Sequence, residues 1–91
     1  MQTFFLLGKY SADSIKEASA DRTEEVVEMV AKLGGKVKSM YALLGGYDLA
    51  IIVDFPKLAV AMKASVGLTV LTGISFTSLP AVPVSDFDKM L

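Results

Sequence analysis

The sequence predicts an α+β protein of ferredoxin-like topology, with a four-stranded antiparallel sheet that carries two helices on one face. Four segments have the apolar or alternating pattern of strands, and two longer segments have apolar residues at helical spacing. These segments follow one another in the order β-α-β-β-α-β. With right-handed crossovers, this order places both helices on the same side of the sheet.

The first strand is expected at residues 2–10, QTFFLLGKY. Both of its faces are partly apolar, which is typical of a central strand covered on both sides. Ser11 follows at a position where it can cap a short helix that runs through Ile15 and Ala18.

The first long helix is expected to begin near Asp21 and Glu24, whose D-x-x-E spacing is close to a capping box. The helix ends at Gly34-Gly35, because glycine adopts the left-handed conformation after a helix without penalty. Its inward side is defined by apolar residues at i, i+3, i+4 and i+7, which are Val26, Met29, Val30 and Leu33.

A β-hairpin is expected around Gly45-Gly46, since a type I′ turn needs positive φ at both central positions. Such a turn pairs Leu44 with Tyr47, and Tyr41 with Ala50. The alternation of residues 36–44 places one set of side chains on a common face, namely Val37, Ser39, Tyr41 and Leu43. The returning strand at residues 47–55 has a second such set, namely Leu49, Ile51, Val53 and Phe55.

The second long helix is expected to begin at Pro56, with Asp54 helping to cap it, and to end at Gly67 or Gly73. Its expected apolar stripe consists of Leu58, Ala59, Met62 and Val66. A last strand follows over residues 74–79.

The C-terminal residues leave the sheet at Pro80 and Pro83 or follow its edge, because proline cannot donate to a strand ladder. Ser85 is expected to cap a closing turn of helix through Phe87, Met90 and Leu91.

Residues 1–91 are expected to form one domain, and 53% of them are apolar. The helices cover one face of the predicted sheet, whereas nothing within the chain covers the other face. Two such sheets stacked face to face would bury that apolar surface, so a homodimer or a larger homo-oligomer is expected.

Composition excludes several kinds of chemistry. The chain has neither cysteine nor histidine, so disulfides, thiolate catalysis and the commonest transition-metal ligands are absent, and we expect no metal and no cofactor. A formal charge of −1 with a single arginine, Arg22, argues against nucleic acid as a partner. Arg22 itself is interpreted as a solvated surface charge, although it could meet an anionic ligand.

A membrane location is not expected. The uncharged stretch at residues 64–85 contains two glycines and two prolines, which indicate a helix end, a turn and a strand. The apolar N-terminal residues lack the charged segment and the cleavage site of a signal peptide. We therefore expect a cytoplasmic protein.

The segment LGGKVKSMYALLGGYDLAIIVDFP resembles the signature stretch of the GYD-domain family. The preceding EEVVEMVAKLGG and the closing SDFDKML are similar to that family's first helix and C-terminal tail, so the resemblance covers essentially the whole chain. The resemblance implies a ferredoxin-like domain of the dimeric α/β-barrel type, and it implies no established activity. The last strand, ISFTSLPAVPV, is more apolar and richer in proline than this family leads us to expect.

Four residues are candidates for a ligand site: Tyr10, Tyr41, Tyr47 and Asp48. The favoured interpretation is structural, with half-buried tyrosine rings and with Asp48 accepting backbone N–H groups at the turn. In the alternative interpretation, Tyr47 and Asp48 line a pocket at the mouth of the sheet and bond to a ligand.

Three functions remain open. The first is a homo-oligomeric module that binds a small apolar ligand or serves assembly. The second is a small cofactor-free enzyme, similar to a monooxygenase or an isomerase, that acts on an apolar substrate between sheet and helices; Tyr47 with Asp48, or Tyr10 with a nearby lysine, would then transfer protons. The third is a structural subunit with a filled interior.

Overall fold

The computed structural model describes residues 1–91. Its strands are β1 (Gln2–Lys9), β2 (Lys36–Ala42), β3 (Leu49–Phe55) and β4 (Ser75–Ala81). Its helices are α1 (Ala12–Lys16), α2 (Ala20–Lys32), α3 (Leu58–Thr72) and α4 (Val84–Asp88). Apart from the short helices α1 and α4, the elements follow the predicted β-α-β-β-α-β order.

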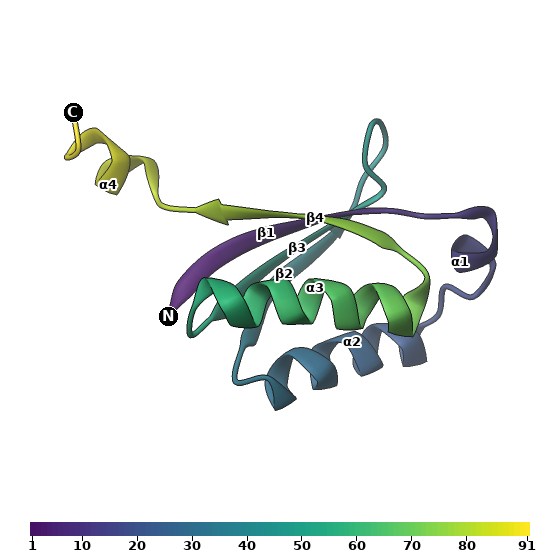
Figure 1. Cartoon of the computed structure of the whole chain (residues 1–91). Coiled ribbons are helices and arrows are strands. Elements are labelled where there is room, and N and C mark those ends of the chain that lie inside the picture. Colours follow the sequence, from purple (N-terminus) through teal and green to yellow (C-terminus); the bar gives the residue numbers. More distant parts are fainter.

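The four strands form one antiparallel sheet in the order β2-β3-β1-β4. The strands β1 and β3 are therefore central, and β2 and β4 are the two edges. Figure 1 shows α2 and α3 side by side on one face of the sheet, with no helix on the other face. The predicted α+β architecture is confirmed.

The core lies between the sheet and the two long helices. The central strands contribute side chains that alternate along β1 and β3, namely Phe4, Leu6, Ile51, Val53 and Phe55. The helices contribute Val26, Val30, Ala61, Ala64 and Leu68. The faces predicted for β3 and α2 are thus the ones that the fold buries, and the rings of Phe4 and Phe55 meet at a centroid distance of 6.1 Å.

The alternation predicted for β2 is wrong beyond its second residue. The pairing register shifts between Val37 and Ser39, which marks a β-bulge. Val37 pairs with Val53 and Met40 pairs with Ile51, so both lie on the helix side of the sheet. The bulge adds one residue, and one residue moves all later side chains to the opposite face. Ser39 and Tyr41 consequently lie on the face without helices.

The two helices after β1 begin at serines. Ser11 caps α1 as predicted: its hydroxyl accepts from the backbone N–H of Ser14, and the hydroxyl of Ser14 accepts from the backbone N–H of Ser11. The cap of α2 is Ser19, whose hydroxyl accepts from the backbone N–H of Arg22 at 3.1 Å. Asp21 therefore lies inside the first turn of α2, where its charge suits the helix dipole, and it is not the predicted cap.

The start of α3 also differs from the prediction. The helix follows Lys57 instead of beginning at Pro56, and no side chain caps it. Asp54 does not act as a cap, because its carboxylate accepts from the hydroxyl of Thr3 at 2.7 Å on the sheet. The helix ends at Gly73, the second of the two predicted stops, in the left-handed conformation with φ 75°.

The side of α3 that was expected to be buried faces outward. Leu58, Met62 and Val66 are 52%, 60% and 67% exposed, and Ala59 is exposed as well. The residues that pack on the sheet are Ala61, Ala64 and Leu68. Because α3 is apolar all round, apolar spacing could not indicate which side is buried. No helix of the chain is both long and apolar enough to cross a membrane.

The last ten residues, 82–91, form a segment that we call the arm. It continues beyond β4, and Figure 1 shows it standing clear of the rest of the molecule. None of the residues of α4 within it is buried. Pro80 lies in the edge strand β4, which agrees with the prediction for these prolines, and Pro83 instead of Ser85 immediately precedes α4.

Candidate functional site

The loop between β2 and β3 is wider than the predicted two-residue turn. Strand pairing ends at Ala42 and Leu49, which leaves six residues, 43–48, in the loop. The register is the predicted one, with Tyr41 opposite Ala50. A type I′ turn is not formed, because Gly45 has a positive φ of 141° whereas Gly46 does not.

Asp48 ties this loop to the end of β1. Its backbone N–H donates to the carbonyl of Gly8 at 2.8 Å, and its carboxylate accepts from the backbone N–H of Tyr10 at 2.9 Å. The ammonium group of Lys9 adds a bond to the carbonyl of Gly46 at 3.3 Å. Asp48 thus accepts a backbone N–H as expected, but the donor lies at the end of β1 and not within the turn.

Tyr10 lies beneath the chain's single arginine. The guanidinium carbon of Arg22 is 5.7 Å from the centroid of the Tyr10 ring, and the guanidinium also donates to the carbonyl of Ser14. Arg22 is only partly exposed, so it is not the free surface charge that the sequence suggested. The sequence contains one arginine and a tyrosine twelve positions before it, and no pattern in it predicted that the two side chains would meet.

A small cavity of about 40 Å³ adjoins this contact, with Tyr10, Arg22, Met40 and Ile74 among its lining residues. A water molecule occupies roughly 30 Å³ of liquid volume. Pockets for organic ligands have volumes of about 300–1,000 Å³, so this cavity has room for water but not for an organic ligand without rearrangement.

The four predicted site residues do not form one cluster. Asp48 and Tyr10 are brought together through the backbone of Tyr10. Tyr47 lies in the loop and is 38% exposed. Tyr41 is 57% exposed on the face of the sheet that has no helices.

That uncovered surface is called the open face from here on. It is formed by alternate residues of the four strands, which are Thr3, Phe5, Leu7, Lys9, Lys36, Ser39, Tyr41, Ala50, Ile52, Asp54, Ser75, Thr77, Leu79 and Ala81. Its centre is apolar, and Phe5 and Leu79 are 37% and 44% exposed. At one end, the carboxylate of Asp54 accepts a hydrogen bond from the Thr3 hydroxyl. Its other oxygen lies 3.8 Å from the ammonium nitrogen of Lys38.

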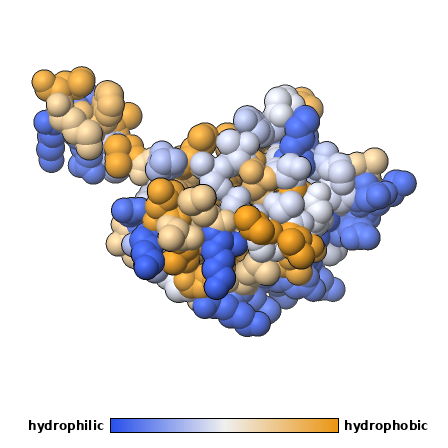
Figure 2. All heavy atoms as spheres, in the orientation of Figure 1, coloured by the Kyte–Doolittle hydropathy of each residue, from blue (hydrophilic) through white to orange (hydrophobic).

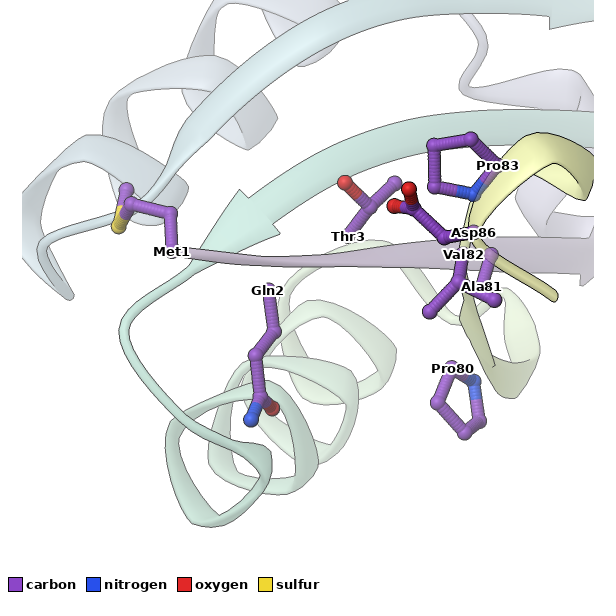
Figure 3. Close-up of a pocket in the computed structure, with 8 residues that line it drawn as sticks. All are labelled: Met1, Gln2, Thr3, Pro80, Ala81, Val82, Pro83 and Asp86. Carbon is purple, nitrogen blue, oxygen red and sulfur yellow. The ribbon is translucent and has the colours of Figure 1, made fainter. Parts of the chain in front are cut away.

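The larger hollows lie away from the predicted residues. One groove of about 430 Å³ runs between α3 and β4. Another hollow of about 450 Å³ lies where the arm leaves the body, and Figure 3 shows it between the first residues of β1 and residues 80–86. Neither is lined by Tyr10, Tyr41, Tyr47 or Asp48.

The sheet with its two covering helices defines a ferredoxin-like α+β protein. The family model described as the GYD domain matches residues 4–91, and the chain belongs to this family. The Gly46-Tyr47-Asp48 triplet forms the last three residues of the loop, and its aspartate accepts a hydrogen bond from the Tyr10 N–H at the end of β1. A comparison with curated proteins found no match.

Two solved structures share the fold. The leucine response regulatory protein (LrpA) of Mycobacterium tuberculosis aligns with a TM-score of 0.65 at 12% identity, over 90% of this chain and 51% of that one. An AsnC family transcriptional regulator from Agrobacterium tumefaciens aligns with a TM-score of 0.59 at 18% identity, over 89% and 50%. The chain spans about half the length of each, and at these identities the likeness is one of fold.

Proposed function

We propose that this chain is a homodimeric module that assembles through its open face and holds a small apolar ligand between the two sheets. The observation that carries the proposal is an apolar sheet face without cover, centred on Phe5 and Leu79. Full burial of an exposed side chain of this size contributes about 1.5–3 kcal/mol, and the part of Phe5 and Leu79 that is still exposed would contribute roughly a third to a half of that. In a two-fold dimer both copies would bury these side chains, so the contribution is doubled.

The space between two open faces is also the best candidate for a ligand cavity. The cavity beside Tyr10 is too small, and the hollows on the surface of one chain are open grooves. Two facing sheets would enclose Phe5, Leu7 and Ile52, with the hydroxyl of Tyr41 as a polar group beside them. An apolar lining with few polar groups suits a small, largely apolar molecule.

The alternative, a cofactor-free enzyme, has less support from the geometry. The carboxylate of Asp48 already accepts from the backbone of Tyr10, and the ammonium of Lys9 contacts Gly46 instead of the Tyr10 hydroxyl. No hydrogen bond within the chain joins Tyr47 to the carboxylate of Asp48, or the Tyr10 hydroxyl to a lysine. The proposal also includes a single domain over residues 1–91, a cytoplasmic location and no nucleic-acid partner.

The test replaces Phe5 by lysine, which places a charge at the centre of the open face. The matched control is Val27→Lys on α2, because Val27 is 41% exposed and Phe5 is 37% exposed. We expect Phe5→Lys to weaken self-association at least tenfold in sedimentation velocity, with an unchanged far-UV circular dichroism spectrum, and Val27→Lys to leave association unchanged. Equal association constants for both variants would contradict assembly through the open face.

A further inference from the structure

The arm is rich in large apolar side chains that are exposed in the single chain. Phe87 and Val84 are 51% and 73% exposed, and Met90 and Leu91 are 70% and 91% exposed. In α4, Val84 and Phe87 are three residues apart and hence on one side of the helix. Figure 2 shows the apolar side chains of the arm projecting away from the molecule. Large apolar side chains gathered on a projecting segment are typical of an interaction site.

Two prolines, Pro80 and Pro83, keep the chain extended as it leaves β4. Pro80 and Pro83 have fixed φ angles, and each proline also biases the residue before it toward an extended conformation. Pro83 is extended, with φ −57° and ψ 144°. The segment 80–83 therefore continues the direction of β4, and it lines the hollow of about 450 Å³ together with residues 1–3 (Figure 3).

A groove of matching character lies between α3 and β4. It is lined by Leu58, Met62, Ser65, Val66, Phe76 and Ser78, with a volume of about 430 Å³. Its two serines bond to each other at 2.9 Å, so its polar groups are satisfied without a ligand. The outer side of α3 that it includes is the apolar stripe that the fold leaves exposed.

The charges around the two surfaces are complementary. Asp86 and Asp88 flank Phe87 in the sequence of the arm, and with Lys89 they leave its side chains a net charge of −1. Lys63 follows Met62 on α3, and Lys57 precedes the helix next to Leu58; both lysines are exposed. An arm seated with Phe87 in the groove would bring carboxylates near ammonium groups.

We infer that the arm of one copy, residues 82–91, seats in the α3–β4 groove of a second copy, and that two copies exchange arms reciprocally. Area supports a second copy as the occupant. Four strands about 4.8 Å apart and about seven residues long give the open face a projected area on the order of 440 Å². Stable interfaces bury about 800 Å² per partner, and two exchanged arms would extend the contact in that direction.

The absence of cysteine allows a direct test by disulfide trapping. The Phe87→Cys and Met62→Cys variants are purified separately, mixed and oxidised, and then separated on a non-reducing gel. We expect a covalent dimer from the mixture, at least fivefold more than from either variant alone. The matched control pairs Phe87→Cys with Glu25→Cys, because Glu25 is exposed on α2, away from the groove.

A double variant, with both substitutions in one chain, separates exchange from folding back. Exchange predicts covalent dimers from this variant at micromolar concentration. An internally linked monomer as the main product would overturn the inference, because the arm would then occupy its own groove. No trapping above the Glu25→Cys control would overturn it as well.

The choice of a second copy as the occupant rests on the proposed contact through the open face, and a further variant tests docking of the arm apart from that contact. Phe5→Lys is introduced into both trapping partners, so that the open face is disrupted while the arm and the groove remain. Persistent trapping with this change shows that arm docking does not depend on the open face. If trapping succeeds without Phe5→Lys and is lost with it, contact through the open face is what brings the two copies together. That result would overturn docking by the arm alone.

Discussion

Within the glycine-tyrosine-aspartate triplet, Asp48 is the residue held in place by hydrogen bonds within the chain. Its carboxylate bonds to the Tyr10 N–H, and its backbone bonds to Gly8 and Leu43. By contrast, a Cβ at Gly46 would meet no atom within 4 Å, and the Tyr47 side chain is partly exposed. Bonds within one chain thus explain the aspartate, and they do not explain the glycine or the tyrosine.

Replacing Asp48 by alanine should destabilise the fold by about 1–2 kcal/mol, because the part-buried Tyr10 N–H loses its acceptor. Asp48→Asn keeps an acceptor oxygen and should cost less. Urea denaturation followed by circular dichroism measures both. Tyr47→Phe is the control, expected within about 0.5 kcal/mol of the parent. If Asp48→Ala unfolds at the parent's midpoint, the anchoring bond does not stabilise the fold.

At the level of single elements, α3 shows why its burial could not be predicted from apolar spacing. Ala61 and Ala64 are small enough to let the helix lie close to the sheet, and the larger residues Met62 and Val66 remain outside. The helix α2 has charged residues on its outer side, and its buried side was predicted correctly. Polar contrast, not apolar content, is what makes the buried side of a helix predictable.

The same substitution on two sides of α3 tests this orientation. Ala64→Leu adds three carbon atoms at a fully buried position and should cost about 1–3 kcal/mol. Ala59→Leu adds the same atoms at an exposed position and should change stability by less than about 0.5 kcal/mol. Thermal unfolding of the two variants side by side gives the comparison. Equal losses of stability would mean that α3 is rotated relative to the arrangement described here.

Strands were more predictable than loops for a physical reason. The register between Tyr41 and Ala50 follows from the chain reversal near Gly45, and it was predicted correctly. The bulge at residue 38 and the six-residue loop were not predicted, because both depend on contacts made by distant residues. Asp48 bonds to the end of β1 across 38 positions of sequence, and no local pattern reports such a bond.

On the scale of the whole molecule, three apolar surfaces lie uncovered: the open face, the outer side of α3 and the arm. The sequence indicated an excess of apolar residues and located one of these surfaces. The other two were missed, since the α3 stripe was assigned to the core and the C-terminal residues were expected only to form a closing turn. The candidate ligand residues were likewise dispersed by the fold, because Tyr41 lies on the open face, Tyr47 in the loop and Tyr10 beside Arg22.

The most direct test of the account is the molar mass of the unmodified chain in solution, measured by light scattering behind size exclusion at several concentrations. One chain has a mass of 9.7 kDa. Assembly through the open face predicts a mass of twice that value or a larger even multiple at micromolar concentration. A mass of 9.7 kDa that stays constant up to millimolar concentration would contradict it, because the apolar open face would then remain in water.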